Sequence, residues 1–350
     1  MFRGLRAVFL LGTLCLSFSY YEISLAKVLQ TPVFLPFFHI PKAIFPTTLF
    51  QGPGTDMWFL PDGKPGKIER ITTEGKIREY TFWPDPAAFD VSLFDYEYTI
   101  TADPAGSVWF YAYPDNIGHM TPDGKVTSFH IPMSTLNGRI EPLGVLFYDP
   151  RGRLWYISAY GSHWGYITVT GKKYTEPSKI ACSVHCLTIG YDGDLWFITG
   201  DSINHLMTNG VIVRYPLSLT GYVSAHEQSP APSAFLQRGP QHALWFWDSH
   251  TNQIGMIDKN NRINEYPHSV TYLSYGINSL AAGSDGNLWM DDFSTSSILR
   301  MTPYGMYTQY PLPDGETAYN LIMGRDGNLW FTTSTLTIGR IHIANPAALI

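Results

Sequence analysis

A short unit of an apolar residue, a tryptophan and a third large apolar residue recurs seven times along the 350 residues, and it restricts the fold more than any other feature. The spacings between successive tryptophans are 51, 46, 41, 49, 44 and 41 residues. One four-stranded propeller blade takes roughly 40 to 50 residues. Seven such units therefore predict a ring of seven blades. The repeat tryptophans are Trp58, Trp109, Trp155, Trp196, Trp245, Trp289 and Trp330.

Turn signals on both sides of each tryptophan predict the strands of a blade. Gly-x-Asp-Gly precedes three of the tryptophans, at 190–193, 283–286 and 324–327. In such a turn glycine adopts positive φ and the aspartate bonds its own backbone. Two further β-rich runs separated by a Gly or Asn turn follow the tryptophan, and no sustained 3.6-residue period indicates a helix after the N-terminal segment. We predict an all-β, seven-bladed β-propeller with four-stranded blades.

The last unit is one strand short, because only a few residues follow Ile341. Residues near 30–41 read as a strand and precede the first complete unit. An open ring would leave exposed sheet edges. We therefore expect this N-terminal strand to complete the last blade and close the ring.

The N-terminal segment has the pattern of an export signal. Arg3 and Arg6 are followed by an apolar run, and Ser24-Leu25-Ala26 is a small-x-small cleavage site. The run is short for a membrane span, which takes roughly 20 residues, although an uncleaved anchor is the alternative. We expect a signal peptide at 1–26, a single propeller domain at 27–350, no membrane span in the mature chain, and a secreted or periplasmic monomer.

Composition excludes one class of partner and explains most of the aromatic residues. Charged residues make up only 15% of the chain, the net charge is -6, and no basic cluster occurs, which argues against nucleic-acid binding. The aromatic share is also 15%, and the repeat tryptophans account for much of it as core. Trp164 and Trp247 lie outside the repeat position, and we expect them in loops where they could stack on a ligand.

Three segments carry a family resemblance: Gly-Ser-Asp-Gly-Asn-Leu-Trp-Met at 283–290, Gly-Arg-Asp-Gly-Asn-Leu-Trp-Phe-Thr at 324–332 and Ile-Gly-Arg-Ile at 338–341. They resemble the repeat of the virginiamycin B lyase (streptogramin lyase) family of seven-bladed propellers. The resemblance implies a metal-dependent carbon-oxygen lyase, with Mg²⁺ as the cofactor, that opens a cyclic depsipeptide by elimination at its ester. The same blade also serves related propellers with other roles, lactonase-like ones among them.

The resemblance also implies positions for the catalytic residues, and this sequence does not match them. The histidine of the penultimate blade falls at Asn278, the Glu-x-His of the last blade at Thr317 and Tyr319, and the following acid at Thr333. Asn and Thr cannot take a proton near neutral pH. We therefore interpret the chain as a ligand-binding or interaction protein on a lyase scaffold. A shift of one or two residues in the alignment would bring Glu316 to the site.

The alternative is an active lyase or lactone-opening enzyme with relocated residues on the face where the loops around the central channel gather. Asp248 and Asp292 follow tryptophan strands and His185 precedes an inner strand. These three are the candidate catalytic residues and the two aspartates the candidate metal ligands, although an Asp there also caps turns and a His also bonds neighbouring strands. A small-molecule or protein ligand is expected at this face. The candidate ligand-binding residues are Glu141, Trp164, Trp247, Asn278 and Tyr319.

Cys182 and Cys186 are the two cysteines that remain after removal of the signal segment. In an exported chain they are expected to form a disulfide. Four residues of extended strand would hold the Cα atoms too far apart, so the bond requires a turn. Two free thiols or a metal site that includes His185 are the alternatives.

Overall fold

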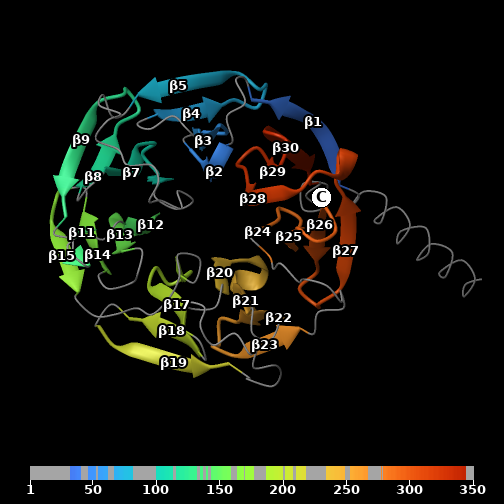
Figure 1. Cartoon of the computed structure of the whole chain (residues 1–350). Helices are drawn as coiled ribbons and strands as arrows, with labels where there is room; N and C mark the ends of the chain where they lie inside the picture. The colour runs from blue at the N-terminus through green and yellow to red at the C-terminus, as the bar shows by residue number, and fades with distance from the viewer. Residues whose placement is uncertain are drawn as a thin grey trace, which may run out of the picture.

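The computed structural model shows seven β-sheets arranged in a ring around a central axis (Figure 1). Each sheet has four antiparallel strands, with the first strand of a blade nearest the axis and the last at the rim. The predicted all-β, seven-bladed propeller is thereby confirmed. The structure describes residues 32–40, 46–52, 54–61, 67–81, 100–112, 116–131, 135–136, 139–140, 143–158, 164–168, 170–176, 187–199, 202–207, 210–217, 234–248, 253–266, 277 and 279–343.

The first four blades follow one another along the chain. Blade 1 contains β2 (Pro46–Gln51), β3 (Met57–Pro61), β4 (Lys67–Ile71) and β5 (Ile77–Thr81). Blade 2 contains β6 (Ile100–Ala102), β7 (Val108–Ala112), β8 (Asn116–Met120) and β9 (Val126–His130). Blade 3 contains β12 (Leu143–Tyr148), β13 (Arg153–Ser158), β14 (Trp164–Thr168) and β15 (Lys173–Glu176). Blade 4 contains β16 (Leu187–Ile189), β17 (Leu195–Thr199), β18 (Ser202–Leu206) and β19 (Ile212–Pro216).

The last three blades complete the ring. Blade 5 contains β20 (Ala234–Arg238), β21 (Leu244–Asp248), β22 (Gln253–Ile257) and β23 (Ile263–Tyr266). Blade 6 contains β24 (Leu280–Ala282), β25 (Leu288–Asp292), β26 (Ser297–Met301) and β27 (Tyr307–Pro311). Blade 7 contains β28 (Ala318–Met323), β29 (Asn328–Thr333), β30 (Thr337–His342) and the N-terminal strand β1 (Val33–His39).

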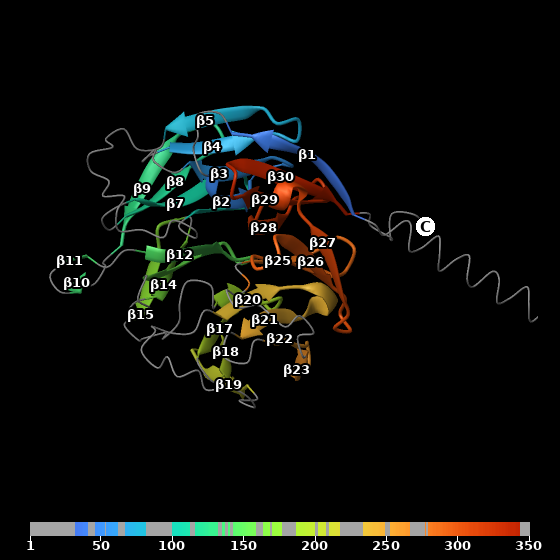
Figure 2. The same ribbon diagram turned by 45° about the vertical axis from the view of Figure 1, so that its right-hand side comes forward.

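Two small features were not expected from the sequence. A two-stranded hairpin of β10 (Thr135–Leu136) and β11 (Arg139–Ile140) is inserted between blades 2 and 3 and projects from the ring (Figure 2). Two single-turn 3-10 helices, η4 (Pro240–His242) and η5 (Pro313–Gly315), lie in blade 5 and before blade 7. Within the described ranges, no helix has the length and apolarity that crossing a membrane would require.

The alternation of strand direction gives every blade two distinct ends. The turn between first and second strands and that between third and fourth lie at one end, called here the hairpin end. The turn between second and third strands and the start of the inner strand lie at the other, called here the mouth end. Residues just before and just after the tryptophan strand therefore lie at opposite ends of the molecule.

The seven repeat tryptophans form the packing layer between blades, with only 0 to 6% of each residue exposed. Trp245 of blade 5, for example, lies in one apolar cluster with Leu280 and Leu288 of blade 6. Burial of a ring of this size removes roughly 150 to 250 Å² from water. The repeat thus encodes the blade-to-blade contact, and the assignment of these tryptophans to the core is confirmed.

The indole N–H of most repeat tryptophans is bonded to the hairpin that precedes it. In blades 4, 6 and 7 the acceptor is the aspartate four residues before the tryptophan, and in blades 2 and 3 an aspartate six residues before it. In blade 5 it is the carbonyl oxygen of Pro240, and the buried Trp58 Nε1 of blade 1 has no partner among the described residues. The aspartate pairs are Asp192–Trp196, Asp285–Trp289, Asp326–Trp330, Asp103–Trp109 and Asp149–Trp155.

Glycine is required where the aspartate stands four residues before the tryptophan. A Cβ placed on Gly283 would lie 2.3 Å from Asp285 Oδ1 and 2.4 Å from Trp289 Nε1. The same conflict exists at Gly190 and Gly324. The glycine is therefore required because the carboxylate and the indole lie against the backbone; at Gly52 and Gly239 the indole alone comes as close.

Replacement of Gly283 by alanine should consequently lower the free energy of unfolding by roughly 1 to 3 kcal/mol, the usual cost of overpacking a core. Ser284→Ala, in the same turn, is the matched control and should change the stability much less. Chemical denaturation of both variants measures the difference. Equal stabilities of the two variants would contradict the role assigned to the glycine.

The N-terminal strand closes the ring as the sequence predicted. β1 pairs antiparallel with β30, from Val33 opposite His342 to His39 opposite Thr337. The guanidinium of Arg340 lies 4.3 Å from the ring centroid of Phe38 and 4.9 Å from that of Trp330, and it donates to the carbonyl oxygen of Thr73 in blade 1. One side chain thus links the closing strand, the last blade and the first.

Removal of the closing strand should leave the edge of β30 unpaired and make unfolding less cooperative. A chain that lacks residues 27–41 is compared with one that begins at residue 27, so that the expected signal segment is absent from both. The shorter chain should melt at a lower temperature and over a broader range in calorimetry. An unchanged thermal transition would show that the ring does not depend on β1.

Candidate functional site

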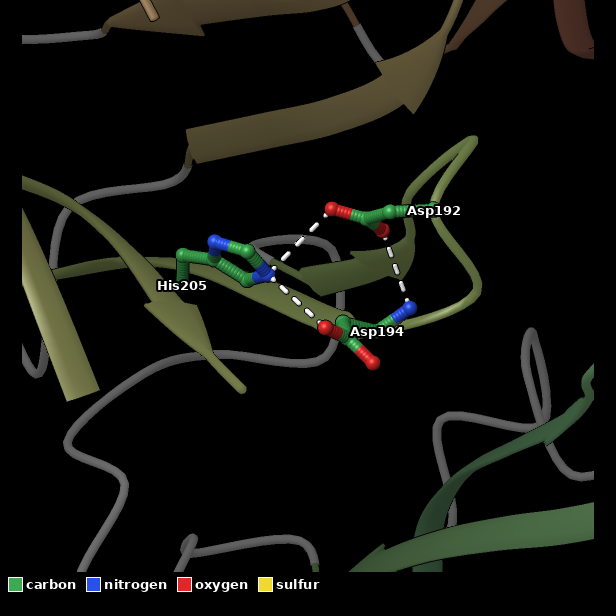
Figure 3. Close-up of side chains that lie close together, drawn as sticks. All are labelled: Asp192, Asp194 and His205. Carbon is green, nitrogen blue, oxygen red and sulfur yellow. Dashed lines mark hydrogen bonds and ion pairs between the residues drawn. The ribbon is translucent and has the colours of Figure 1, made fainter. Parts of the chain in front are cut away.

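Three ionisable side chains converge at the hairpin end of blade 4 (Figure 3). His205 Nε2 lies 3.2 Å from Oδ2 of Asp192 and 3.2 Å from Oδ2 of Asp194. One ligand atom from each residue lies within 4.8 Å of the others, which is a spacing that could hold a metal ion. No motif in the sequence pointed to this cluster.

The repeat gives this cluster a structural explanation. His205 stacks on Trp196 with ring centroids 4.0 Å apart, while Asp192 accepts the indole N–H. In blade 6 the corresponding cation is Arg300, which bonds Asp285 at 2.8 Å and lies over Trp289. His205 therefore occupies the position that Arg300 holds in blade 6, where the side chain bonds the hairpin aspartate and packs on the repeat tryptophan. Arg151 of blade 3 also bonds Asp194, at 2.7 Å.

Blade 2 places another histidine, His119, in the same position on its repeat tryptophan. His119 stacks on Trp109 with ring centroids 4.0 Å apart. Its buried Nε2 has no hydrogen-bond partner in the part of the chain that the structure describes, and it lies 4.0 Å from Asp103 Oδ2. Burial lowers the pKa of His119, and the nearby Asp103 offsets this only in part. Since the neutral ring is favoured in the folded state, protonation of His119 works against folding.

This shift gives a pH prediction with a definite sign. The pKa of His119 is lower in the folded than in the unfolded chain. The stability that the neutral imidazole contributes is therefore fully present above about pH 6.5, the ordinary pKa of histidine. It is lost as the pH falls through the pKa of His119 in the folded chain. His119→Met, which copies Met256 in the same position of blade 5, should abolish this loss. Denaturant titrations between neutral and acidic pH should show the variant gaining stability relative to the wild type. Parallel profiles would contradict the prediction.

At the mouth end, the carboxylates of blade 6 are buried and internally bonded. Asp292 is 1% exposed; its Oδ1 accepts from the backbone N–H and the hydroxyl of Ser294, and its Oδ2 from the hydroxyl of Thr295 at 2.6 Å. Asp291 Oδ1 accepts from the backbone N–H of Ser279, whose hydroxyl in turn accepts the N–H of Leu321 in blade 7. These bonds fix the β25–β26 turn and tie blade 6 to blade 7.

Blade 7 presents hydroxyl groups at the same end. Glu316 accepts from the hydroxyl of Thr335 at 2.7 Å and from that of Thr337 at 3.5 Å. Thr333 shares hydrogen bonds with the hydroxyls of the same two threonines. Thr317 and Ser334 exchange two further bonds, so the loop before β28 is held to the turn after β29. The mouth end of this blade is a hydroxyl network around one carboxylate.

Two aromatic rings meet beside this network. Phe293 follows β25, and Tyr319 lies in the inner strand β28; their ring centroids are 6.0 Å apart and the planes are inclined at 59°. Phe293 is 37% exposed. Burial raises the pKa of Tyr319, and the charge of Asp291 raises it further, so the phenol is neutral at physiological pH.

Several predicted site residues can be compared with this geometry. Asp292 caps a turn, as the alternative reading of the sequence proposed. The expectation that Trp164 and Trp247 lie in loops is wrong: they belong to β14 and β21, and each is 5% exposed. Trp164 packs on Trp155 with centroids 6.0 Å apart, because it continues the apolar layer between blades.

The remaining predictions on single residues stay predictions. The backbone of Asp248 ends β21, but the placement of its side chain is not described. Five predicted residues lie outside the described part of the chain: Glu141, Cys182, His185, Cys186 and Asn278.

The donors described at the mouth end do not fit the magnesium ion that the resemblance implies. Mg²⁺ prefers carboxylate oxygens and water in octahedral geometry. Thr317 and Thr333 supply no carboxylate, both oxygens of Asp292 already accept bonds from its own turn, and both oxygens of Glu316 accept threonine hydroxyls. Among the described residues, the one group with the spacing of a metal site is Asp192, Asp194 and His205, at the opposite end of the molecule. No step of a mechanism is therefore routed through a metal here.

The fold defines a class: a seven-bladed β-propeller with four-stranded blades. Comparison with protein families then gives a match to the virginiamycin B lyase family, over residues 34–223 and 220–347. The chain belongs to the virginiamycin B lyase family. Comparison with curated proteins gives no match.

Solved structures with this fold include a streptogramin B lyase, with a TM-score of 0.68 and 22% identity over 89% of this chain and 98% of that one. A catalytically inactive histidine variant of virginiamycin B lyase from Staphylococcus aureus with quinupristin has a TM-score of 0.67 and 21% identity, over 89% and 100% of the two chains. YCF48 bound to D1 peptide has a TM-score of 0.60 and 12% identity, over 87% and 95%. At these identities the likeness concerns the fold.

Proposed function

We propose that the chain is an exported binding protein that holds a small-molecule or protein ligand at the mouth end of blades 6 and 7 without changing it chemically. The observation that carries this proposal is the residue set of the last blade. Thr317, Tyr319 and Thr333 stand where the family resemblance calls for ionisable catalytic groups. The chain thus has the propeller fold of the family but lacks, at these three positions, the ionisable groups that acid–base catalysis would use.

The described carboxylates do not replace the missing groups. A general base must reach the proton it removes and have lone pairs available to accept it. Asp292 is buried and its two oxygens accept three bonds within one turn. Glu316 is the most accessible of these acids, and its oxygens accept threonine hydroxyls. The carboxylates of Asp292 and Glu316 therefore stabilise the local turns by accepting these hydrogen bonds.

Export is supported by the N-terminal sequence. Arg3 and Arg6, the apolar run and Ser24-Leu25-Ala26 follow the order of a cleaved signal. Cys182 and Cys186 are compatible with an oxidising compartment, where a disulfide between them would persist. The ligand is then one met outside the cytoplasm.

One alternative function is supported by a specific observation. Glu316 lies one residue before Thr317, so the last blade still carries a carboxylate next to the expected catalytic position. A metal-dependent lyase or lactone-opening enzyme that uses Glu316, with Asp248 and His185, is the second candidate. It requires a divalent metal for turnover.

Quinupristin, the compound present with the inactive relative, separates the two candidates. The mature protein is incubated with it in the presence of Mg²⁺, and the mass and the ester are followed by liquid chromatography and mass spectrometry. We expect no ring opening above the rate without protein, because the described mouth lacks a free base.

A streptogramin B lyase assayed in parallel is the positive control, and Glu316→Gln is the matched variant. Ring opening that stops on addition of a chelator, and that Glu316→Gln abolishes, would overturn the binding proposal in favour of the enzyme.

A further inference from the structure

Two of the outer turns of the ring are apolar where the others are charged. The outer turn of a blade is here the five-residue turn between its third and fourth strands, which lies at the hairpin end. Its last residue is Lys or Arg in blades 1, 2, 3 and 5, but Val211 in blade 4 and Met306 in blade 6. Blade 6 also has Tyr304 in the middle of the turn, where blades 1 and 2 have Glu or Asp. The six outer turns are 72–76, 121–125, 168–172, 207–211, 258–262 and 302–306.

The backbone of the outer turn does not require these apolar residues. Blade 2 builds the turn from Thr-Pro-Asp-Gly-Lys, and blade 6 builds it from Thr-Pro-Tyr-Gly-Met. The glycine has a φ of 89° at Gly124 and 83° at Gly305, and its N–H donates to the carbonyl oxygen of the threonine three residues before it, at 2.8 and 2.9 Å. A charged turn therefore serves the fold equally well. Tyr304 and Met306 are 80% and 64% exposed, so packing within the blade does not explain them either.

Blade 4 lacks a hydrogen bond at its outer turn and exposes a methionine instead. In blades 1, 3 and 6 the first residue of the turn is a threonine whose hydroxyl accepts the backbone N–H four residues later. In blade 5 the carboxylate of Asp258 accepts the same bond. Blade 4 has Met207 at this position, 37% exposed, and a thioether is only a weak acceptor. Stability alone would favour threonine here.

The chain also enters the ring at the hairpin end. β1 begins at Val33, which lies opposite His342 at the end of β30 and is more than half exposed. Six residues, 27–32, separate Val33 from the expected cleavage site after Ala26, and the apolar run of the export signal precedes that site. A bilayer that takes up this run is therefore met from the hairpin end of the propeller.

The two apolar turns are separated by a charged one. Blade 5 lies between blades 4 and 6 in the ring, and its outer turn contains Asp258, Lys259 and Arg262 (Figure 1). A stable protein interface has a contiguous apolar core from which water is excluded. A bilayer surface requires only that apolar side chains protrude at one end of the molecule, and tyrosine is enriched at the membrane–water interface. The arrangement therefore fits a lipid surface better than a protein partner.

We propose that the hairpin end is a membrane-docking face, on which Met207, Tyr304 and Met306 insert into the interfacial region of a lipid bilayer. The inference goes beyond the proposed function, because it concerns the end of the molecule opposite to the mouth. The six outer turns contain five Lys or Arg and three Asp or Glu, so charges of both signs surround the apolar side chains. Burial of apolar area, rather than net charge, is expected to drive the contact. Docking in this orientation leaves the mouth end open to a ligand in solution.

Co-sedimentation with vesicles of pure phosphatidylcholine tests the proposal on the chain that begins at residue 27, which lacks the apolar run. We expect part of the protein to sediment with the vesicles at millimolar lipid, to the same extent at low and high salt. Tyr304→Asp and Met306→Lys together give blade 6 the outer turn of blade 2. This double variant should keep the thermal transition of the wild type and bind vesicles at least about tenfold more weakly, because charged side chains replace two that insert.

Reciprocal and single changes serve as matched controls. Asp123→Tyr with Lys125→Met gives blade 2 the outer turn of blade 6 and should strengthen vesicle binding several-fold. Met207→Thr supplies the missing hydroxyl acceptor, so it should weaken vesicle binding without lowering the stability. Hydrogen peroxide should oxidise Met207 and Met306 to the sulfoxide more slowly when vesicles are present, as peptide mass spectrometry can measure.

Absence of vesicle binding, equal binding of the wild type and the blade 6 double variant, or binding that requires anionic lipid and disappears with salt would each overturn the inference. Self-association that the double variant abolishes, without vesicle binding, would assign the apolar turns to a second copy of the chain instead. None of these outcomes depends on quinupristin turnover, which tests the proposed function, so the two proposals can fail separately.

Discussion

The propeller depends on one repeated contact, a tryptophan indole buried between blades with its N–H bonded to the hairpin that precedes it. The ring supplies apolar area, and the bond satisfies a donor that would be costly to bury alone. The aspartate acceptor stands at two different positions along the hairpin, and a carbonyl takes its place in blade 5. Six of the seven blades therefore make this bond with acceptors at different positions, and among the described residues blade 1 supplies no acceptor to Trp58.

The same contact accounts for polar clusters that would otherwise suggest function. Asp192, Asp194 and His205 have the spacing of a metal site, yet each has a structural counterpart in blade 6. At the mouth end the repetition is looser: an aspartate three residues after the repeat tryptophan occurs in blades 5 and 6 alone, as Asp248 and Asp292. Recurrence in another blade thus identifies residues that serve the scaffold.

The architecture could be predicted almost completely from the sequence, because each blade contains one repeat tryptophan with turn signals before and after it. The sequence also placed the closing strand, since the last unit was visibly one strand short. Side-chain roles were harder to predict. Trp247 reads as a loop residue after the repeat tryptophan, but β21 extends through it and buries it against blade 6. The stack of His205 on Trp196 depends on register across two strands. Its sequence signal is faint: an apolar residue, any residue, then His or Arg and another apolar residue, as in 203–206, 298–301 and 338–341.

Closure of the ring by β1 has a consequence for the order in which the protein forms. Val33 and His342 are opposite one another, so the first described strand must wait for the last one to exist. Bringing together two segments about 300 residues apart costs roughly 5 kcal/mol of chain entropy if nothing else is formed, and far less once six blades are stacked. The ring is therefore expected to grow blade by blade and to be sealed at the end. Until that seal forms, β30 is an open edge, and the growing molecule is most exposed to pairing with another copy of itself.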